Sequence, residues 1–398
     1  MRWASCGCWL YQNIFLPRFN QHVRYTEKSC FHAVHFEQFN RSGFSETDLD
    51  TAFHLAQSEH EKRKETESVA LQTKLFNLEV YKPHVNSGFI LQQEDFTDAS
   101  RKLRQMSDSS SVETEELLTS MEEVDGLVEV YRFPLLNAAC LDRLNHLLDL
   151  FDQQGCKRDK PNTMNYGGVT LSVIPGSQAR NCGEHKVDCG GADVDFTESL
   201  LDLGLRSILT RLFPDLGFTI DSYRSFTVEY SDSTLPSHDD DRHKDKELAA
   251  HYDNSEITLN ICLRLTNGGG GGRLYFCHRS PYDDPLEFAK PIKEVEHQPG
   301  WVIIHRGRHV HGVHPFLSSD GSSRRSIIVW LRCSSTRNKR CPRCFLTPNL
   351  IPMKVWYNGH VINCTDLPPE VESQGNFVRA GFGDGMLLTN EHRMCTSI

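Results

Sequence analysis

Five short strand-like segments restrict the fold of this 398-residue chain more than any other feature. They lie at 224–230, 256–265, 273–277, 300–305 and 326–332, and clusters of Gly and Asp separate them. Short strands divided by turn signals are typical of a sandwich or barrel of antiparallel strands. Because segments of helical character precede these strands, we expect an α+β fold in which helices buttress a jelly roll or barrel.

Composition divides the chain into three parts. Residues 1–125 hold a charged, amphipathic helix at 45–78, followed at 103–123 by a Ser-, Glu- and Asp-rich segment that is typical of a linker. A strand at 127–133, which Pro134 ends, and a helix capped by Asn137 then open a domain over 126–333. The core of this domain is expected at about 219–333, and residues 334–398 form a C-terminal extension with a C-x-x-C pair.

Charge and hydropathy exclude several classes of protein. The net charge of -10 gives no overall basic field, so we expect no nucleic-acid partner. No apolar run reaches the length of about 18 residues that a membrane span needs, so we expect no span. The N-terminal stretch 9–17 is interrupted by polar residues and by Pro17, which disfavours a signal peptide. We therefore expect an intracellular protein of the cytoplasm or nucleus.

The residues that carry chemistry begin with His251 and Asp253, directly before the apolar strand at 257–263. Side chains alternate along an extended chain, so these two project to the same face and can share one metal ion. A second tripeptide of this kind, His238 to Asp240, lies in a run of like charges with no apolar strand after it. That context is typical of a solvated loop, and we therefore prefer His251 and Asp253.

A third ligand must come from another strand, and the segment 299–315 supplies His305, His309, His311 and His314. Two histidines and one carboxylate on one face leave the opposite coordination positions open, as Fe(II) oxygen chemistry requires. His309 and His311 would share one face of a strand, so spacing leaves both as candidates. Each of the four could also be an ordinary histidine of the surface or the core that binds no metal.

A buried cation is expected on the strand at 324–332. Arg324 lies six residues before Trp330, so both face one side of that strand. A guanidinium can bind a carboxylate through two parallel hydrogen bonds, which suits it to a dicarboxylate co-substrate. Strand alternation lets only one of Arg324 and Arg325 face the pocket, and Arg324 is preferred.

Taken in order, these motifs resemble the prolyl-4-hydroxylase-like branch of the 2-oxoglutarate/Fe(II) dioxygenases. The set comprises H-x-D at 251–253, Gly-Gly-x-Leu-x-Phe at 271–276, Pro-Gly before an apolar strand at 299, His-Gly-x-x-Pro at 311–315, and Arg324 with Trp330. Within that branch, the chain resembles the 2-oxoglutarate and iron-dependent oxygenase domain-containing protein 2 group. The segments that carry this resemblance lie at 6–8, 22–25, 158–165, 338–344 and 381–385. The resemblance covers most of the chain and is strongest at 219–345.

The resemblance implies a double-stranded β-helix that binds Fe(II) through His251, Asp253 and His311 as the catalytic residues. It implies 2-oxoglutarate on Arg324 and Tyr230, dependence on L-ascorbate (vitamin C), and consumption of O2 with release of succinate and CO2. The reaction implied is hydroxylation of an unidentified protein or small-molecule substrate, with a prolyl or lysyl side chain of a protein favoured. Tyr230 could instead be an ordinary tyrosine of the core. We expect Asn260 to be an ordinary strand residue.

Two pairs among the fourteen cysteines stand apart: Cys6 with Cys8, and Cys341 with Cys344. Four thiolates would complete a tetrahedral zinc site, and free thiols are the alternative. The chain could therefore also be a metal-binding module without turnover, or a zinc-dependent interaction module. An assay of oxygen uptake or succinate release separates both from a dioxygenase.

Overall fold

The computed structural model describes residues 4–5, 13–16, 18–19, 21–81, 88–162, 164–177, 191–216, 220, 222–231, 245–266, 272–280, 291–316, 322–333, 354–357, 360–363 and 386–387. The chain forms two compact units. The first comprises Met1–Ser5, Ala70–Arg332 and Asp384–Leu388. The second comprises Cys6–Val69, Cys333–Gly383 and Thr389–Ile398.

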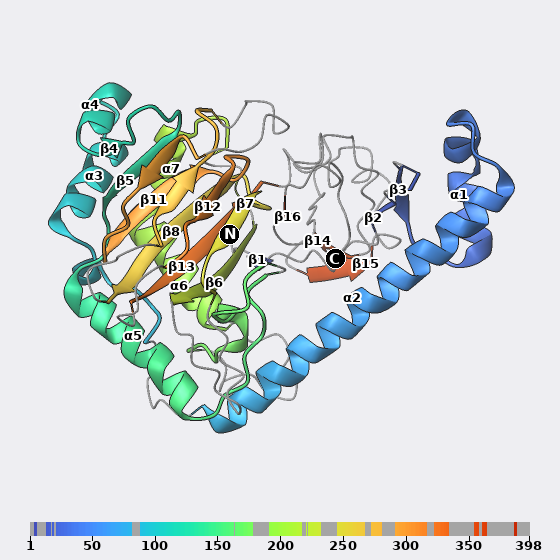
Figure 1. The fold of residues 1–398 in the computed structure, drawn as a ribbon, viewed down its shortest axis with the longest axis horizontal. Helices are drawn as coiled ribbons and strands as arrows, with labels where there is room; N and C mark the ends of the chain where they lie inside the picture. The colour runs from blue at the N-terminus through green and yellow to red at the C-terminus, as the bar shows by residue number, and fades with distance from the viewer. Residues whose placement is uncertain are drawn as a thin grey trace. The chain divides into compact units, whose positions relative to one another are not determined.

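Two facing β-sheets make up the centre of the first unit (Figure 1). The large sheet contains, in spatial order, β1 (Ala4–Ser5), β6 (Ser222–Ser231), β13 (Ser323–Arg332), β8 (Ile257–Leu265), β11 (Trp301–Arg306), β5 (Val130–Pro134) and β4 (Glu122–Glu123). The small sheet contains β10 (Lys293–Val295), β9 (Leu274–Phe276), β12 (His311–Val313), β7 (Leu248–Tyr252) and β16 (Met386–Leu387).

The strand order is that of a jelly roll. Among the eight strands from β6 to β13, the large sheet holds β6-β13-β8-β11 and the small sheet holds β10-β9-β12-β7. Neighbours within each set are antiparallel, and the chain crosses repeatedly from one sheet to the other. Apolar side chains from both sheets, among them Phe226, Phe276 and Ile328, form the core between them. The expected double-stranded β-helix is thus confirmed.

All five expected strand segments are present, as β6, β8, β9, β11 and β13. The sequence did not predict β7, β10 and β12, which are three to five residues long and belong to the small sheet. These strands are too short for an alternating pattern to be recognised, and β7 and β12 carry histidines where a core strand normally carries apolar residues.

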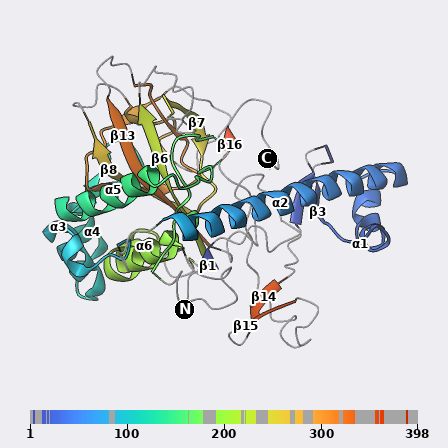
Figure 2. The same ribbon diagram turned by 90° about the horizontal axis from the view of Figure 1, so that it is seen from below.

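Helices cover the outer face of the large sheet. The expected helix after Asn137 is α5 (Ala138–Gln153), and the Asn137 side chain accepts a hydrogen bond from the backbone N–H of Cys140 at 3.0 Å. Figure 2 shows α5 beside β8 and β13. Asn145 of α5 donates to the Leu263 carbonyl of β8 at 3.0 Å, which joins the helix to the sheet.

The expectation of a linker at 103–123 is wrong. This region lies in the first unit and forms the end of α3 (Asp98–Asp108), then α4 (Thr114–Thr119) and β4. Thr97 caps α3 by accepting from the N–H of Ser100, and each helix buries one leucine, Leu103 or Leu117. A helix that buries so narrow a stripe looks polar in sequence, which is why composition alone indicated a linker. Two further helices, α6 (Ala192–Leu200) and α7 (Arg206–Leu212), complete the cover.

The second unit has a core of its own. It contains the hairpin of β2 (Asn13–Leu16) and β3 (Gln21–Arg24), α1 (Lys28–Arg41) and the first part of α2 (Glu46–Val80). Phe19, Phe31, Phe39 and Phe53 are buried in this core. A second pair of strands, β14 (Lys354–Tyr357) and β15 (His360–Asn363), also belongs to it.

The long helix α2 confirms the helix expected at 45–78. Within the described parts of the chain, no helix combines the length and apolar character required to cross a bilayer.

Candidate metal centre and co-substrate pocket

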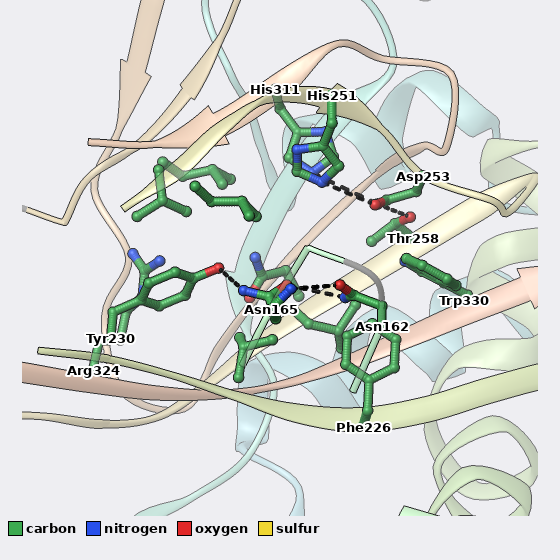
Figure 3. Close-up of a pocket in the computed structure, with 16 residues that line it drawn as sticks. Asn162, Asn165, Phe226, Tyr230, His251, Asp253, Thr258, His311, Arg324 and Trp330 are labelled. Carbon is green, nitrogen blue, oxygen red and sulfur yellow. Dashed lines mark hydrogen bonds and ion pairs between the residues drawn. The ribbon is translucent and has the colours of Figure 1, made fainter. Parts of the chain in front are cut away.

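Three buried side chains converge between the sheets: His251, Asp253 and His311 (Figure 3). His251 of β7 and His311 of β12 are direct partners in the antiparallel ladder, with ring centroids 4.4 Å apart. Asp253 follows the end of β7. Its Oδ1 lies 3.4 Å from Nε2 of His251 and its Oδ2 lies 3.6 Å from Nε2 of His311. All three potential ligand atoms lie within 4.8 Å of one another.

Both histidines are oriented by the same local hydrogen bond. Nδ1 of His251 donates to the carbonyl of Ala249 at 2.9 Å, and Nδ1 of His311 donates to the carbonyl of His309 at 2.8 Å. Since a carbonyl can only accept, the proton must be on Nδ1 of each ring. Each Nε2 therefore faces the space between the three side chains, where the neutral form of the ring offers a lone pair to a metal.

A short chain of hydroxyl groups orients the carboxylate. Thr258 of β8 donates from Oγ1 to Oδ2 of Asp253 at 2.6 Å, so the hydroxyl of Ser255 must donate to Thr258 across 2.7 Å. Burial opposes ionisation of Asp253, but His311 and His251 outweigh it and hold the pKa of that carboxyl below its usual range. The site thus contains one carboxylate beside two imidazoles, and burial lowers the pKa of His311 to about 3, which keeps that ring neutral.

The other candidate histidines are not ligands of this cluster. His309 is buried against Phe276, with ring centroids 4.9 Å apart. His305 packs against His311 at 4.6 Å and donates from Nδ1 to the carbonyl of Arg306. His314 lies near the carboxylate of Glu294, at 3.3 Å. Among the residues that the structure describes, only His251, Asp253 and His311 form a group of three potential metal ligands; the rejected pair His238 and Asp240 lies outside those residues.

A pocket extends from the three ligands to Arg324, between the two sheets (Figure 3). Arg324 is 3% exposed, its Nη1 donates to the carbonyl of Gly272, and its guanidinium lies 5.1 Å from the centre of the Tyr230 ring. Gly272 has a positive φ of 64°, and a Cβ there would lie 2.0 Å from the ring of Phe316. Glycine is therefore needed for the carbonyl that holds Arg324.

Arg325 has the opposite orientation and is absent from the pocket wall. Its Nε donates to Glu229 at 3.0 Å and its Nη1 donates to Asp149 of α5 at 2.6 Å. The alternation of β13 thus places Arg324 on the inner face of the large sheet and Arg325 on the outer face. This is the parity that the spacing to Trp330 predicts, and Trp330 also lines the pocket.

Two asparagines on the pocket wall were not singled out from the sequence. Asn162 and Asn165 come from a segment that precedes the core strands, and Asn165 donates to the hydroxyl of Tyr230 at 3.1 Å. The segment 158–165 had been noted for its resemblance only, and no chemical pattern within it marks a site. Asn260, expected to be an ordinary strand residue, also lines the pocket.

The residues fit Fe(II) and 2-oxoglutarate. At one end, two imidazoles and a carboxylate form the donor set that suits non-haem iron. Elsewhere on the wall, three buried polar atoms have no hydrogen-bond partner within the described part of the chain: Nε of Arg324, Oδ1 of Asn260 and Nε1 of Trp330. A buried guanidinium nitrogen without an acceptor is costly, and a bound carboxylate would satisfy it.

The proposed zinc ligands Cys6, Cys8, Cys341 and Cys344 lie outside the described residues. None of the six described cysteines forms a disulfide, and four of them are buried.

Comparison with known proteins agrees with the site. No family model matches the chain. It is 28% identical over 364 residues to 2-oxoglutarate and iron-dependent oxygenase domain-containing protein 2 of Danio rerio, covering 91% of this chain and 95% of that protein. The protein of the same name from Homo sapiens is 28% identical over 351 residues, covering 87% of this chain and 91% of the relative.

A crystal structure of a Pseudomonas putida prolyl-4-hydroxylase matches 52% of this chain and 88% of its own, with 14% identity and a TM-score of 0.31. The group resemblance seen in the sequence is confirmed by the two relatives above. Together with the buried triad, their names indicate that the chain is a 2-oxoglutarate-dependent iron oxygenase.

Proposed function

We propose that this oxygenase hydroxylates an unactivated C–H bond of a protein side chain, with Fe(II) held by His251, Asp253 and His311. Arg324 and Tyr230 would bind the distal carboxylate of 2-oxoglutarate. One observation carries the proposal: one pocket joins the three potential ligands to a buried guanidinium whose Nε has no hydrogen-bond partner among the residues that the structure describes. A metal-binding module without turnover would need no such cation beside the ligand cluster.

When bound, Fe(II) and 2-oxoglutarate supply the oxidation, in which 2-oxoglutarate and O2 give succinate, CO2 and the hydroxyl group of the product. The protein's residues supply geometry. The backbone carbonyls behind His251 and His311 fix both rings, and Thr258 fixes the carboxylate of Asp253. Apolar side chains from both sheets, including Phe226, Leu274 and Ile328, line the pocket and exclude water from it.

A prolyl or lysyl side chain is the substrate class to test first, because it is the one that the prolyl-4-hydroxylase-like motifs favour. This rests on analogy between folds and sites, so it ranks below the reaction class. Ascorbate, which the same resemblance implies, should sustain turnover by keeping the iron reduced.

The test is succinate release by the full chain with Fe(II), 2-oxoglutarate, O2 and ascorbate, with and without a library of prolyl- and lysyl-containing peptides. We expect substrate-independent turnover that a subset of peptides stimulates. Asp253→Ala removes the one anionic ligand and should abolish turnover and Fe(II) binding while the far-UV circular dichroism stays unchanged. Wild-type turnover in Asp253→Ala would contradict the assignment of the metal ligand, and stimulation by no peptide would contradict the substrate class.

A further inference from the structure

A segment far upstream of the core strands completes the wall of the pocket. Residues 164–169, here called the strap, run along the edge of β6 opposite β13, beyond the two residues of β6 that pair with β1. The backbone N–H groups of Thr227 and Glu229 donate to the carbonyls of Val169 and Gly167 at 2.8 and 3.1 Å. Gly168 has φ of 123°, and a Cβ there would lie 2.1 Å from the carbonyl oxygen of Thr227, so the close approach requires glycine.

Asp245 fixes the other end of the strap. Its carboxylate accepts from the backbone N–H groups of Tyr166 and Gly167 at 3.1 Å and from Nδ2 of Asn165 at 3.0 Å. Asp245 is itself hydrogen-bonded to β6, since its N–H donates to Glu229 and its carbonyl accepts from Ser231. The strap is thus bound to β6 both directly and through this carboxylate.

The amide of Asn165 can take only one orientation. Its Nδ2 faces two acceptors, the Asp245 carboxylate and the Tyr230 hydroxyl, and its Oδ1 accepts from Nδ2 of Asn162 at 3.0 Å. A flipped amide would direct its oxygen at the carboxylate and its NH2 at another NH2. Asn162 is held in turn, because its Oδ1 accepts from the N–H groups of Met164 and Asn165 at 2.8 Å.

This orientation decides what the Tyr230 hydroxyl can do. Because Asn165 donates to the hydroxyl oxygen, the phenolic proton is directed elsewhere, and no described residue accepts it. Burial raises the pKa of Tyr230, so the hydroxyl keeps its proton over the physiological range. The hydroxyl and Nε of Arg324 are therefore two donors without acceptors, on neighbouring side chains that line the same pocket (Figure 3).

We propose that Asn165 is a positioning residue of the co-substrate site: it holds the Tyr230 hydroxyl so that its proton points at the distal carboxylate of 2-oxoglutarate beside Arg324. The inference rests on the proposed function. It also makes the strap part of the co-substrate site, since the strap holds Asn165 in place. A merely structural Asn165 would stabilise the strap without distinguishing between ligands.

The experiment compares two ligands that differ only at the distal end. The full chain, loaded with Mn(II) and kept free of O2, is titrated calorimetrically with 2-oxoglutarate and with 2-oxopentanoate, which has a methyl group in place of the distal carboxylate. Asn165→Ala and Asn165→Asp should weaken 2-oxoglutarate binding by roughly one to two decades, the loss typical of a hydrogen bond to a charged group. Binding of 2-oxopentanoate should change by less than about twofold.

A double-mutant cycle with Tyr230→Phe supplies the second measurement. Once the hydroxyl is absent, Asn165→Ala should change the 2-oxoglutarate affinity by less than about twofold. Asn145→Ala, which removes a buried amide between α5 and β8 away from the pocket, serves as the control and should leave both affinities unchanged. Equal weakening of both ligands by Asn165→Ala, or additive effects of Asn165→Ala and Tyr230→Phe, would overturn the proposal.

A wrong assignment of the co-substrate site would give results different from those of a wrong role for Asn165. If the wild-type protein binds 2-oxoglutarate no more tightly than 2-oxopentanoate, or if Arg324→Ala leaves 2-oxoglutarate binding unchanged, the co-substrate site itself is misassigned. If both of those tests succeed and Asn165→Ala has no effect on 2-oxoglutarate binding, only the role of Asn165 is wrong.

Discussion

At the scale of single residues, Thr258 shows how the proposed metal centre would depend on a side chain that is not one of the proposed ligands. Its hydroxyl donates to Oδ2 of Asp253 at 2.6 Å and is itself fixed by Ser255. Valine has nearly the same shape and no hydroxyl. Thr258→Val should therefore weaken Mn(II) or Fe(II) binding by roughly 10- to 100-fold, the usual effect of losing a partner of a ligand.

Thr258→Ser keeps the hydroxyl and should bind the metal nearly as the wild-type protein does. Metal affinity is measured by competition with a chelator, which does not depend on turnover. Equal affinities of Thr258→Val and the wild-type protein would show that the carboxylate needs no such support.

Variants of the two adjacent arginines of β13 should differ in their effects: one should lose affinity for 2-oxoglutarate, and the other should lose stability of the fold. Truncating one side of a buried charge-assisted contact typically costs about 2 to 5 kcal/mol, so Arg324→Ala should lower 2-oxoglutarate affinity by roughly one to three decades. Arg325→Ala should leave that affinity unchanged but destabilise the fold by about 1.5 to 3 kcal/mol, because it removes charge-assisted hydrogen bonds to Glu229 and Asp149. A 2-oxoglutarate titration and a urea denaturation of each variant check the pair; the reverse ranking would contradict the orientation of β13.

Strand alternation and the family resemblance together predicted His251, Asp253, His311, Arg324 and Tyr230 as one site, and all five line one pocket. Alternation alone left His309 beside His311 as a candidate. Asn162 and Asn165 could not be found in this way. Asn165 is held in the pocket wall by a tertiary hydrogen bond to Asp245, 80 residues away, and Asn162 is bonded to Asn165. No local spacing encodes the long-range contact.

At the scale of secondary structure elements, a buried ion pair joins α5 to the segment before α3. Nη1 and Nη2 of Arg143 each donate to the carboxylate of Asp95 at 2.7 Å. Burial opposes ionisation of Asp95, but the hydrogen bonds from Arg143 outweigh it and hold the pKa of that carboxyl below its ordinary value. A lowered pKa in the folded state means that the pair stabilises the fold above the ordinary pKa near 4 and ceases to do so as the pH falls below it.

Asp95→Asn should therefore lower the free energy of unfolding at pH 7 by about 1.5 to 3 kcal/mol, and the difference from the wild-type protein should shrink as the pH falls below about 4. Urea denaturation at several pH values measures this difference. Glu37→Gln, which breaks an exposed ion pair with Arg41, is the control and should have little effect at any pH. A pH-independent difference for Asp95→Asn would mean that packing, not charge, is lost.

The strands of the large sheet could be predicted from the sequence better than those of the small sheet. The large-sheet strands and α5 have long apolar patterns, and the sequence shows them. The small sheet is assembled from strands of three to five described residues that only pairing with one another defines. The region of α3 and α4 was mistaken for a linker because Leu103 and Leu117 are the only hydrophobic residues that these helices bury.

At the scale of the whole molecule, the two compact units have separate cores. His251, Asp253, His311 and Arg324 all belong to the first unit, so a ligand bound there stabilises that unit. We expect scanning calorimetry to show two transitions, of which Mn(II) with 2-oxoglutarate raises one. A ligand at 100 times its dissociation constant adds about 2.7 kcal/mol to the stability of the state that binds it.

Phe31→Ala, a substitution in the second unit, also tests whether the two units unfold separately. Phe31 is fully buried in the core of α1 and α2, so its removal should cost about 3 to 5 kcal/mol. The transition that the ligands leave unchanged should then move to lower temperature, while metal affinity stays constant. Movement of both transitions together in either experiment would show that the units unfold as one.

The direct pairing of His251 with His311 has a consequence for folding fidelity. A slip of β12 by one residue would set Val310 or Gly312 opposite His251 and turn the imidazole of His311 toward the other face of the sheet. Neither Val310 nor Gly312 carries a ligand atom. Leu248, Leu274 and Val313 of the same sheet are buried in the core, so a slip would also turn apolar side chains away from it. Burial and the proposed metal site thus require the same register, and a chain that paired out of register would be expected to lose both its core contacts and its affinity for the ion.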